Sequence, residues 1–333
     1  MRATLEACSP AERREAVAMI DTRGLRRTFR SRRGEVVAVD GVDLHVAAGE
    51  VFGFLGPNGA GKTTTLRMLA TLLVPTGGEA TVAGYDLRRE PARVRERIGY
   101  VAQGGGTDPA LSAREELVLQ GRLYGLDKRE AQRRTVALLE AFELETAADR
   151  PTGTYSGGQR RRLDLALGLI HRPRLVFLDE PTTGLDPQGR ARMWDEVRRL
   201  RDGGMTVFLT THYLEEADAL CDRLAIIDHG RIVAEGTADQ LKRQVAGDLV
   251  TLSVQGDPVV AEALLAAQPF VREASREDGT IRLYVEHGEA ALPAVLRLLD
   301  GAGLPLQTIA LSRPSLDDVF LRTTGRSLRD DAE

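Results

Sequence analysis

Cysteine is nearly absent from this chain of 333 residues, which contains only Cys8 and Cys221. Two cysteines are too few for a metal cluster or a disulfide framework, so a reducing cytoplasm is the expected compartment. Long apolar segments are lacking too, because no run approaches the roughly 18 to 20 residues that span a bilayer. Residues 1–21 also lack the apolar core of a signal peptide. Any work at a membrane is therefore expected to need a partner.

An excess of basic charge is also missing, since the formal net charge is −4 and the isoelectric point is about 5.9. This balance gives no bulk electrostatic reason to bind nucleic acid, and no nucleic-acid partner is expected. Lysine is scarce among the 45 basic residues and occurs only at Lys62, Lys128 and Lys242. Apolar residues, in contrast, make up 42% of the chain, which is enough for a proper core and, at this length, for two domains.

One of the three lysines, Lys62, lies in the segment GPNGAGKT at residues 56–63, the phosphate loop, which has the G-x-x-x-x-G-K-[ST] pattern. The apolar residues 51–55 before it predict a buried strand, and residues 64–73 after it predict a helix. Glycines let successive backbone N–H groups converge on an anion at the positive end of the helix dipole. Lys62 then supplies a point charge for the β- and γ-phosphates, and the Thr63 hydroxyl is placed for Mg²⁺.

A second segment, YSGGQ at residues 155–159, also predicts an anion site, because a Ser-Gly-Gly lies at the start of a helix expected to reach residue 170. A helical insertion precedes it, which opens with a capping box of Ser112 and Glu115. Before that insertion, Gln103 ends a predicted strand and is followed by three glycines. Two phosphate sites in one chain need a reason.

Acidic residues and a histidine follow two further apolar segments. Residues 175–178 end in Asp179 and Glu180, and residues 207–211 end at His212. At the carboxyl edge of a parallel strand, Asp179 can hold Mg²⁺ and Glu180 can orient or deprotonate a water. Adjacent acids after a strand are often only a solvated turn. A lone histidine is more often structural, but its place at a strand tip near a phosphate site favours a role in chemistry.

Taken together, these segments resemble the ATP-binding cassette family over residues 25–242. The phosphate loop is similar to Walker A, Gln103 to the Q-loop, residues 155–159 to the signature motif, residues 175–180 to Walker B, residues 184–186 to the D-loop, and His212 to the switch histidine. In this family two cassettes pair head to tail, so that the signature helix of one caps the γ-phosphate held by the other, which explains the two phosphate sites. Tyr155 and Phe29 depart from the usual Leu and Tyr. Neither change removes a phosphate contact, although base stacking is put in doubt.

The resemblance implies ATP and Mg²⁺ as ligands. The implied catalytic residues are Glu180, His212 and Gln103, and the implied metal site comprises Thr63, Gln103 and Asp179. The implied nucleotide-binding residues are Phe29, Gly56, Pro57, Asn58, Gly59, Ala60, Gly61, Lys62, Thr63, Thr64, Tyr155, Ser156, Gly157, Gly158, Gln159 and Asp186. For Phe29, stacking on the nucleobase and ordinary core packing both stay open.

The function that the resemblance implies is that of an ATP-hydrolysing subunit of an exporter. The subunit would form a homodimer on binding ATP and power efflux of a small molecule, a drug or antibiotic, through a separate integral membrane permease, at the cytoplasmic face of the cell membrane. The alternative is a soluble cassette ATPase that acts on ribosomes or DNA, but such proteins usually carry two cassettes or a long coiled-coil insertion. A GTPase-like switch is disfavoured by the YSGGQ segment and by the lack of an N-K-x-D motif.

The last quarter of the chain has a β-α-β-β-α-β pattern between residues 249 and 311, the order of a ferredoxin-like fold. A final helix begins at Ser315, is capped by Asp318 in the S-x-x-D manner, and carries an apolar face of Leu316, Val319 and Phe320. This tail resembles the daunorubicin-resistance ATP-binding proteins of bacterial drug exporters. We expect the apolar face to dock on the cassette pair or on the membrane partner, while the alternative is that it completes the core of its own domain.

The expected fold class is α/β, with a P-loop NTPase cassette followed by a small α+β ferredoxin-like domain. The cassette should comprise a RecA-like parallel core, an antiparallel β subdomain and a helical subdomain. The antiparallel part is expected at residues 25–49, with turns at Arg33-Gly34 and Asp40-Gly41. The expected divisions are a flexible tail at residues 1–20, the cassette at 21–244, and an accessory C-terminal domain at 245–333.

Overall fold

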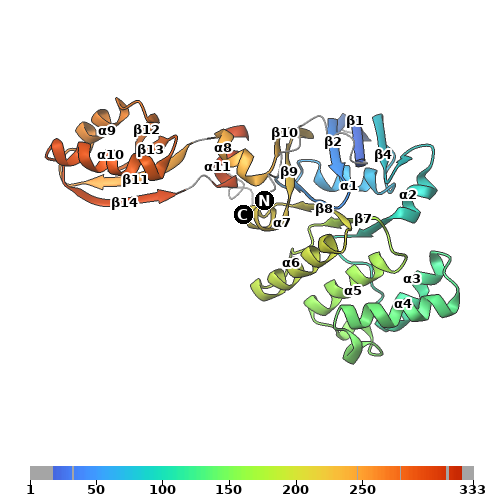
Figure 1. Ribbon diagram of the computed structural model, residues 1–333. Coiled ribbons are helices and arrows are strands. Elements are labelled where there is room, and N and C mark those ends of the chain that lie inside the picture. Colours follow the sequence, from blue (N-terminus) through green and yellow to red (C-terminus); the bar gives the residue numbers. More distant parts are fainter. Residues whose placement is uncertain (1–17, 32–33, 246, 278, 313–314, 325–333) are drawn as a thin grey trace, which may run out of the picture. The chain divides into compact units, whose positions relative to one another are not determined.

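The computed structural model of the chain describes residues 18–31, 34–245, 247–277, 279–312 and 315–324 (Figure 1). The chain divides into two units, the first ending at Glu235 and the second beginning at Gly236. Most of the tail predicted at residues 1–20 lies outside the described residues. Its last three residues are the start of a strand instead, because Met19 and Ile20 bury their side chains in the core. Among the described residues, no helix is both long and apolar enough to cross a membrane.

The short apolar segments form a six-stranded sheet in the first unit, in the order β10-β9-β3-β8-β7-β6. The strands are β3 (Val51–Leu55), β6 (Ile98–Val101), β7 (Leu175–Asp179), β8 (Thr206–Thr211), β9 (Arg223–Asp228) and β10 (Arg231–Gly236). All pairs from β9 to β6 are parallel. Every residue of β3, β7 and β8 is buried, as expected for parallel strands that are covered on both faces. The carboxyl ends of these three strands therefore meet at one edge of the sheet.

Two local features support this sheet. A hairpin joins β9 to β10 through His229 and Gly230, which have φ angles of 45° and 77°, as a tight two-residue turn requires. Cys221 packs against β3, where a Cβ at Gly53 would lie 2.5 Å from its sulfur. Burial raises the pKa of the Cys221 thiol well above its usual range, so this partly buried cysteine is expected to be unreactive.

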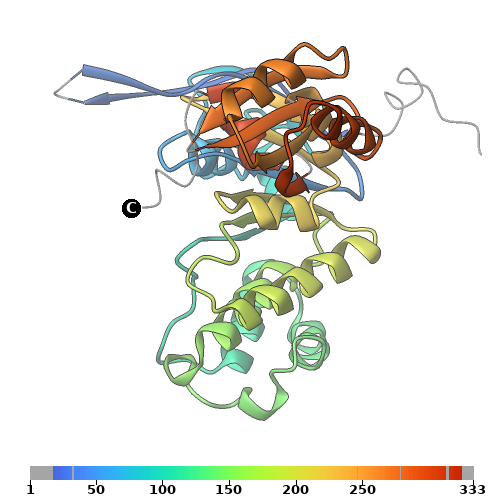
Figure 2. The same ribbon diagram turned by 90° about the vertical axis from the view of Figure 1, so that its left-hand side faces the viewer.

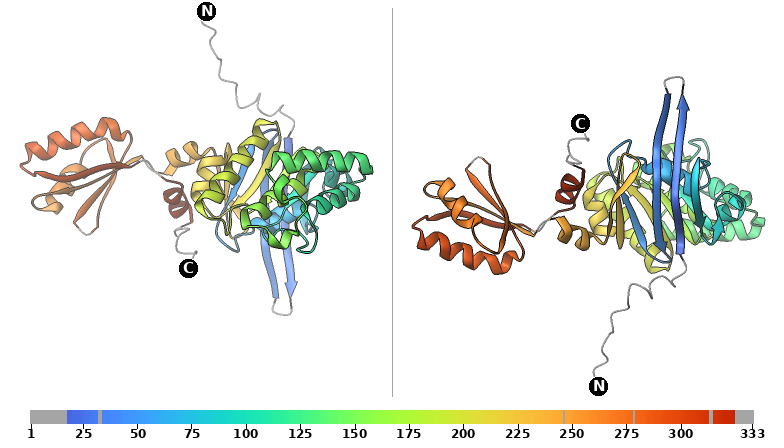
Figure 3. Two further views of the ribbon diagram at one scale, coloured as in Figure 1. Left: turned by 90° about the horizontal axis from the view of Figure 1, so that it is seen from below. Right: turned by 90° about the horizontal axis from the view of Figure 1, so that it is seen from above.

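The predicted antiparallel sheet has the order β2-β1-β4-β5. Its strands are β1 (Ala18–Ser31), β2 (Gly34–Ala47), β4 (Gly77–Val82) and β5 (Tyr85–Asp86). The β1–β2 hairpin extends beyond the rest of its unit (Figures 2 and 3). The turn predicted at Asp40-Gly41 is wrong, because Gly41 lies inside β2 with a φ of 80°, at a register shift that makes it a β-bulge. Of the other predicted turn, Arg33 lies outside the described residues and Gly34 begins β2.

Helices complete the first unit: α1 (Lys62–Leu69), α2 (Pro91–Arg97), α3 (Ala113–Leu123), α4 (Lys128–Ala141), α5 (Gly157–Leu169), α6 (Pro187–Asp202) and α7 (Leu214–Leu220). Figure 1 shows α3, α4 and α5 grouped on the opposite side of the parallel sheet from β1 and β2. The capping box predicted at the start of α3 is confirmed, since Ser112 and Glu115 bond reciprocally. The helix after the phosphate loop ends at Leu69 and not at Leu73, because Thr71 has a left-handed φ of 61°.

The second unit contains a four-stranded antiparallel sheet in the order β12-β13-β11-β14. Its elements are β11 (Asp248–Val254), α9 (Pro258–Ala266), β12 (Val271–Glu277), β13 (Thr280–Val285), α10 (Gly288–Gly301) and β14 (Leu306–Ser312). The first and third strands of this series, β11 and β13, lie at the centre, as in a ferredoxin-like fold. Alternate residues of β11 and β13, such as Val250 and Leu283, form its core with Val295 of α10.

A pair of helices, α8 (Ala238–Val245) and α11 (Leu316–Thr324), also belongs to the second unit and packs together. Leu316, Val319 and Phe320 of α11 are at most 2% exposed. The apolar face that we expected to dock elsewhere is therefore already covered within the chain. The same pairing moves the domain boundary from the predicted residue 245 to Gly236, because α8 groups with α11 and not with the cassette.

Candidate active site

The phosphate loop lies between β3 and α1, with Thr64 in the first turn of the helix. Gly56 and Gly61 must be glycines, because a Cβ at either position would lie within 2.5 Å of a carbonyl oxygen, of Ile227 or Ala38. Lys62 is only 4% exposed, and its ammonium donates to the carbonyls of Gly56 at 2.7 Å and Pro57 at 3.0 Å. The loop therefore curves around the lysine and holds its ammonium against two backbone carbonyls.

Asp179, at the end of β7, contacts the end of this loop. Its Oδ1 accepts hydrogen bonds from the hydroxyls of Thr63 at 3.0 Å and Thr210 at 2.8 Å. A carboxylate beside a loop hydroxyl is a set of hard oxygen ligands, which Mg²⁺ prefers. No cluster of three or more acidic, histidine or cysteine side chains that could hold a metal occurs among the described residues. A cation here would therefore rely on Asp179, Thr63 and the phosphates it neutralises.

Glu180 is the point where the implied catalytic residues converge. Its Oε1 lies 3.4 Å from the Lys62 ammonium, and its Oε2 lies 3.3 Å from Nδ1 of His212. The side-chain amide of Gln103 donates to the same Oε2 at 2.9 Å, and the hydroxyl of Thr183 donates to it at 3.2 Å. These residues come from four separate segments of the chain. The fold thus brings the phosphate loop, the glutamine after β6 and the histidine after β8 onto one carboxylate.

Charge at this carboxylate is strongly stabilised. Burial alone would raise the pKa of Glu180, but the imidazole of His212 and the ammonium of Lys62 outweigh that effect and lower it to about 2. Burial also lowers the pKa of Lys62, and the negative charge of Glu180 opposes this change. Glu180 therefore stays ionised at every physiological pH, as an acceptor of hydrogen bonds.

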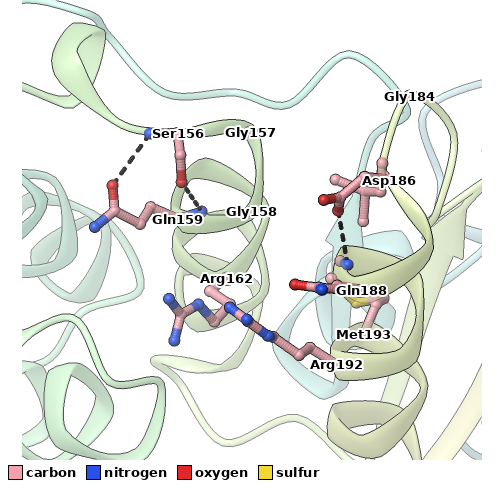
Figure 4. Close-up of a pocket in the computed structure, with 12 residues that line it drawn as sticks. Ser156, Gly157, Gly158, Gln159, Arg162, Gly184, Asp186, Gln188, Arg192 and Met193 are labelled. Carbon is pink, nitrogen blue, oxygen red and sulfur yellow. Dashed lines mark hydrogen bonds between the residues drawn. The ribbon is translucent and has the colours of Figure 1, made fainter.

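The signature segment, residues 155–159, faces a different pocket (Figure 4). Ser156 caps α5, with its hydroxyl accepting from the Gln159 amide at 3.2 Å and its own amide donating to the Gln159 side chain at 3.1 Å. The pocket has a volume of about 360 Å³ and is lined by Ser156 to Gln159 and Arg162 on one side, and by Gly184 to Asp186, Gln188, Gly189, Arg192 and Met193 on the other. Asp186 caps α6 by accepting from the Gly189 amide at 2.8 Å. No residue of the phosphate loop lines this pocket.

Two of the implied nucleotide-binding side chains differ in exposure. Tyr155 is 6% exposed and its hydroxyl donates to the Ala147 carbonyl at 2.6 Å. Its ring packs in the helical core, so its side chain is not available to a ligand, and a contact of Tyr155 with nucleotide would involve its backbone. Phe29 is 39% exposed on β1, with the Arg27 guanidinium 4.6 Å from its ring centroid. Core packing is therefore wrong for Phe29, whose ring lies at the surface.

Arg161 and Glu216 lie beside the catalytic residues, although no sequence motif predicts either of them. Arg161 is 6% exposed and bonds the backbone around Glu180, yet in the sequence it is hidden within the run Arg160-Arg161-Arg162. Glu216, on α7 just after His212, is fully buried, and burial raises the pKa of its carboxyl. Helical spacing could have signalled Glu216, since Ala217 and Leu220 of the same helix are also buried.

Comparisons with known proteins agree with this architecture. The ABC transporter family profile matches residues 39–183, and the profile of the DrrA1-3-like ATP-binding protein C-terminal domain matches residues 236–324. Among solved structures, a dimeric ATP-binding cassette in a post-hydrolysis state with ADP and Pi is similar with a TM-score of 0.61 and 26% identity, over 66% of this chain and 98% of that one. An ATP-binding subunit of an ABC transporter gives a TM-score of 0.60 and 29% identity, over 68% and 92%. The predicted cassette fold is confirmed.

Relatives extend over almost the whole chain. Daunorubicin resistance ATP-binding protein DrrA3 of Streptomyces coeruleorubidus is 49% identical over 90% of this chain and 94% of its own length. Daunorubicin/doxorubicin resistance ATP-binding protein DrrA of Streptomyces peucetius is 46% identical over 93% and 94%. Nod factor export ATP-binding protein I of Rhizobium sp. (strain N33) is 41% identical over 93% and 98%. The chain therefore belongs to the ATP-binding cassette family, in the group that contains the daunorubicin-resistance ATP-binding proteins.

Proposed function

We propose that this protein is the ATP-hydrolysing subunit of an exporter, which powers efflux of a small molecule, a drug or antibiotic, through a separate integral membrane permease. The observation that carries the proposal is the convergence of Lys62, Gln103 and His212 on the ionised carboxylate of Glu180. The choice of cargo rests on the names of the relatives with the higher identities, which are resistance proteins for daunorubicin and doxorubicin. The Nod factor export relatives favour export as the common direction.

The phosphate loop suits ATP, since Gly56 and Gly61 let its backbone pack closely against the Ile227 and Ala38 carbonyls and Lys62 is held where it can reach the phosphates. When bound, Mg²⁺ would neutralise charge on the β- and γ-phosphates, and Thr63 and Asp179 would hold it. Arriving phosphates would draw Lys62 away from the Gly56 and Pro57 carbonyls and from Glu180.

Glu180 would then orient the attacking water. A carboxylate with a pKa near 2 is a weak proton acceptor, so in the free protein its main capacity is to accept hydrogen bonds. The side chains of Gln103 and Thr183 donate to it and fix its position, and the His212 imidazole lies 3.3 Å from it. Phosphoryl transfer depends on such positioning and on charge stabilisation more than on covalent chemistry.

A second copy of the chain would complete the site. The helix N-terminus at Ser156 lies in a pocket that no phosphate-loop residue lines, so within one chain the two anion-binding segments do not form one site. We infer a head-to-tail homodimer in which Ser156 to Gly158 of one subunit face the phosphates held by Lys62 of the other. Attachment to the permease would hold the dimer peripherally at the cytoplasmic face of the membrane, with residues 236–333 as an accessory domain.

The test is the change Glu180→Gln, which keeps the volume and polarity of the side chain and removes the charge that orients water. We expect steady-state ATP hydrolysis to fall by at least about 100-fold while ATP affinity is retained, and the variant to accumulate as an ATP-bound dimer. Turnover and size in ATP and Mg²⁺ are measured beside Glu79→Gln, an exposed control on β4. Turnover near that of the unmodified protein would contradict the proposed role of Glu180.

A further inference from the structure

Three consecutive arginines, Arg160, Arg161 and Arg162, lie on the first two turns of α5, but only Arg161 is buried. Arg160 is exposed, and Arg162 bonds the Phe142 carbonyl at 3.0 Å and the Glu143 carboxylate at 2.9 Å. Arg161 instead points toward the parallel sheet. A buried guanidinium needs partners for its N–H groups, and their identity shows what the residue does.

The partners of Arg161 are three backbone carbonyls next to the catalytic residues. Its Nε donates to Pro181 at 2.9 Å and its Nη2 to Asp179 at 3.3 Å, so the two carbonyls that flank Glu180 are both held. Its Nη1 donates to Ala102 at 2.7 Å, the residue immediately before Gln103. One rigid, planar group therefore fixes the backbone at both residues whose side chains meet at 2.9 Å in the site.

The backbone of Glu180 requires such support. Its φ is 45°, in the left-handed region that a residue with a Cβ seldom adopts. Such a conformation persists only where the surroundings determine it, and here hydrogen bonds on both sides of the residue do so. The Glu180 amide also donates to the Thr210 carbonyl at 3.2 Å, which ties the residue to β8. Releasing the two flanking carbonyls would let the peptide relax and turn the carboxylate away from its partners.

We propose that Arg161 is a positioning residue for ATP hydrolysis, which holds Glu180 and Gln103 in their working orientation and fastens both to α5, the helix that Ser156 caps. This inference rests on the proposed ATPase function. Because the N-terminus of α5 is the part that faces a second subunit, Arg161 joins the surface that receives one nucleotide to the glutamate that acts on another. No other described side chain bonds carbonyls on both sides of Glu180.

The test compares Arg161→Lys with Arg160→Lys in the full-length protein. Lysine keeps the charge but has no planar fork, so it cannot bond three separated carbonyls in fixed geometry. We expect Arg161→Lys to lower kcat by about 10- to 100-fold, the scale of a misplaced catalytic group, while KM and nucleotide affinity change by less than about twofold. Arg160→Lys should leave kcat within about twofold. In the double variant with Arg161→Lys and Gln103→Ala, kcat should fall by less than the product of the two single fold-changes. The reason is that both substitutions disturb the same contact between Gln103 and Glu180.

The outcomes separate this proposal from the proposed function. If the unmodified protein does not hydrolyse ATP, the proposed function fails; if it does and Arg161→Lys keeps its kcat, or loses affinity as much as kcat, only the positioning role is overturned. Should Arg161→Lys not fold, Asp164→Asn replaces it. The Asp164 carboxylate lies 3.9 Å from the Arg161 guanidinium and accepts from the Gly106 amide at 3.2 Å, a bond that asparagine can keep. A fall in kcat of about threefold at unchanged KM, the scale of a weak ion pair, supports the proposal, and an unchanged kcat contradicts it.

Discussion

At the scale of single residues, two buried carboxylates of this protein have opposite ionisation behaviour because their neighbours differ. Glu180 is surrounded by donors and stays charged, whereas Glu116 on α3 is 7% exposed and lies near two other acids. Burial raises the pKa of Glu116, and the charges of Asp108 and Asp164 act in the same direction, so that it reaches about 7 although the Asp108 amide donates to it. Glu116 therefore changes its charge within the physiological pH range, beside the loop that follows Gln103.

The pKa of Glu116 is about 7 in the folded state and 4.5 in the unfolded state. At a pH between these two values, the native state therefore holds a proton that the unfolded state has lost. The unfolding free energy should therefore fall as pH rises from about 4.5 to about 7, by up to about 3 kcal/mol, and stay reduced above that. Glu116→Gln keeps the acceptor for the Asp108 amide and removes the titration. We expect its stability to be flatter over this range and higher than that of the unmodified protein above pH 7.

The measurement is urea unfolding between pH 5 and 8, followed by the fluorescence of Trp194, the single tryptophan, which lies on α6 of the first unit. Glu140→Gln, an exposed change on α4, serves as the control and should follow the unmodified protein. Parallel stability curves for Glu116→Gln and the control would contradict the assignment of this titration to Glu116.

The residues of the candidate site differ in how far the sequence could predict them. Lys62, Glu180 and His212 were predictable as a group, because each follows a buried apolar strand and parallel strands end at one edge of a sheet. Arg161 was not, because three adjacent arginines look alike until the packing of α5 shows which one faces inward. The burial of the Tyr155 side chain was not predictable either, because the residues around it in the sequence do not show which way the ring points.

At the scale of elements, strands of the parallel sheet were found because burial on both faces leaves continuous apolar runs. The bulge at Gly41 was not predicted, because the sequence Asp-Gly is typical of a turn as well as of a bulge. Only the pairing of β2 with β1 distinguishes the two. The destination of the α11 apolar face was also beyond the sequence. An amphipathic helix indicates that something covers it, but not that α8, about 70 residues earlier, does so.

The α8–α11 pairing predicts a sharp difference between neighbouring residues of α11. Phe320 is fully buried and Leu321 is 49% exposed. Phe320→Ala should destabilise the second unit by about 3 kcal/mol, the usual cost of removing a buried aromatic ring, and Leu321→Ala should cost less than about 0.5 kcal/mol. Hydrogen exchange of the α8 and α11 amides in the full chain measures both. Equal protection in the two variants would show that Phe320 is not part of a packed core.

At the scale of the whole molecule, the separation of the two anion-binding segments is the feature that the proposed second copy would explain. Lys62 lies in the phosphate loop, Ser156 caps α5, and the pocket in front of Ser156 contains no residue of that loop. A surface with a helix N-terminus at Ser156, lined also by Arg162 and Arg192, suits an anion presented from outside the chain (Figure 4). In the proposed head-to-tail dimer, each nucleotide would contact one anion-binding segment from each subunit.

The last prediction tests that sharing with two variants that damage opposite halves of a site. Lys62→Ala removes the charge that binds the phosphates, and Ser156→Arg places a bulky side chain at the α5 N-terminus, which blocks close approach of its amides. Each variant alone should be nearly inactive. In a mixed dimer both lesions fall in one site and the other site is intact, so isolated mixed dimers should show about half of normal hydrolysis if the two sites fire independently.

Activity in the mixture is measured after capture of mixed dimers through two different affinity tags, so that each homodimer serves as a matched control. Recovery can arise only where an undamaged Lys62 and an undamaged Ser156 come from different chains, because neither chain contains both. A site built within one chain would give no recovery at any mixing ratio. Absence of activity in captured mixed dimers that still bind ATP at the intact phosphate loop would therefore contradict the shared site, since binding would show that the unaltered Lys62 is functional.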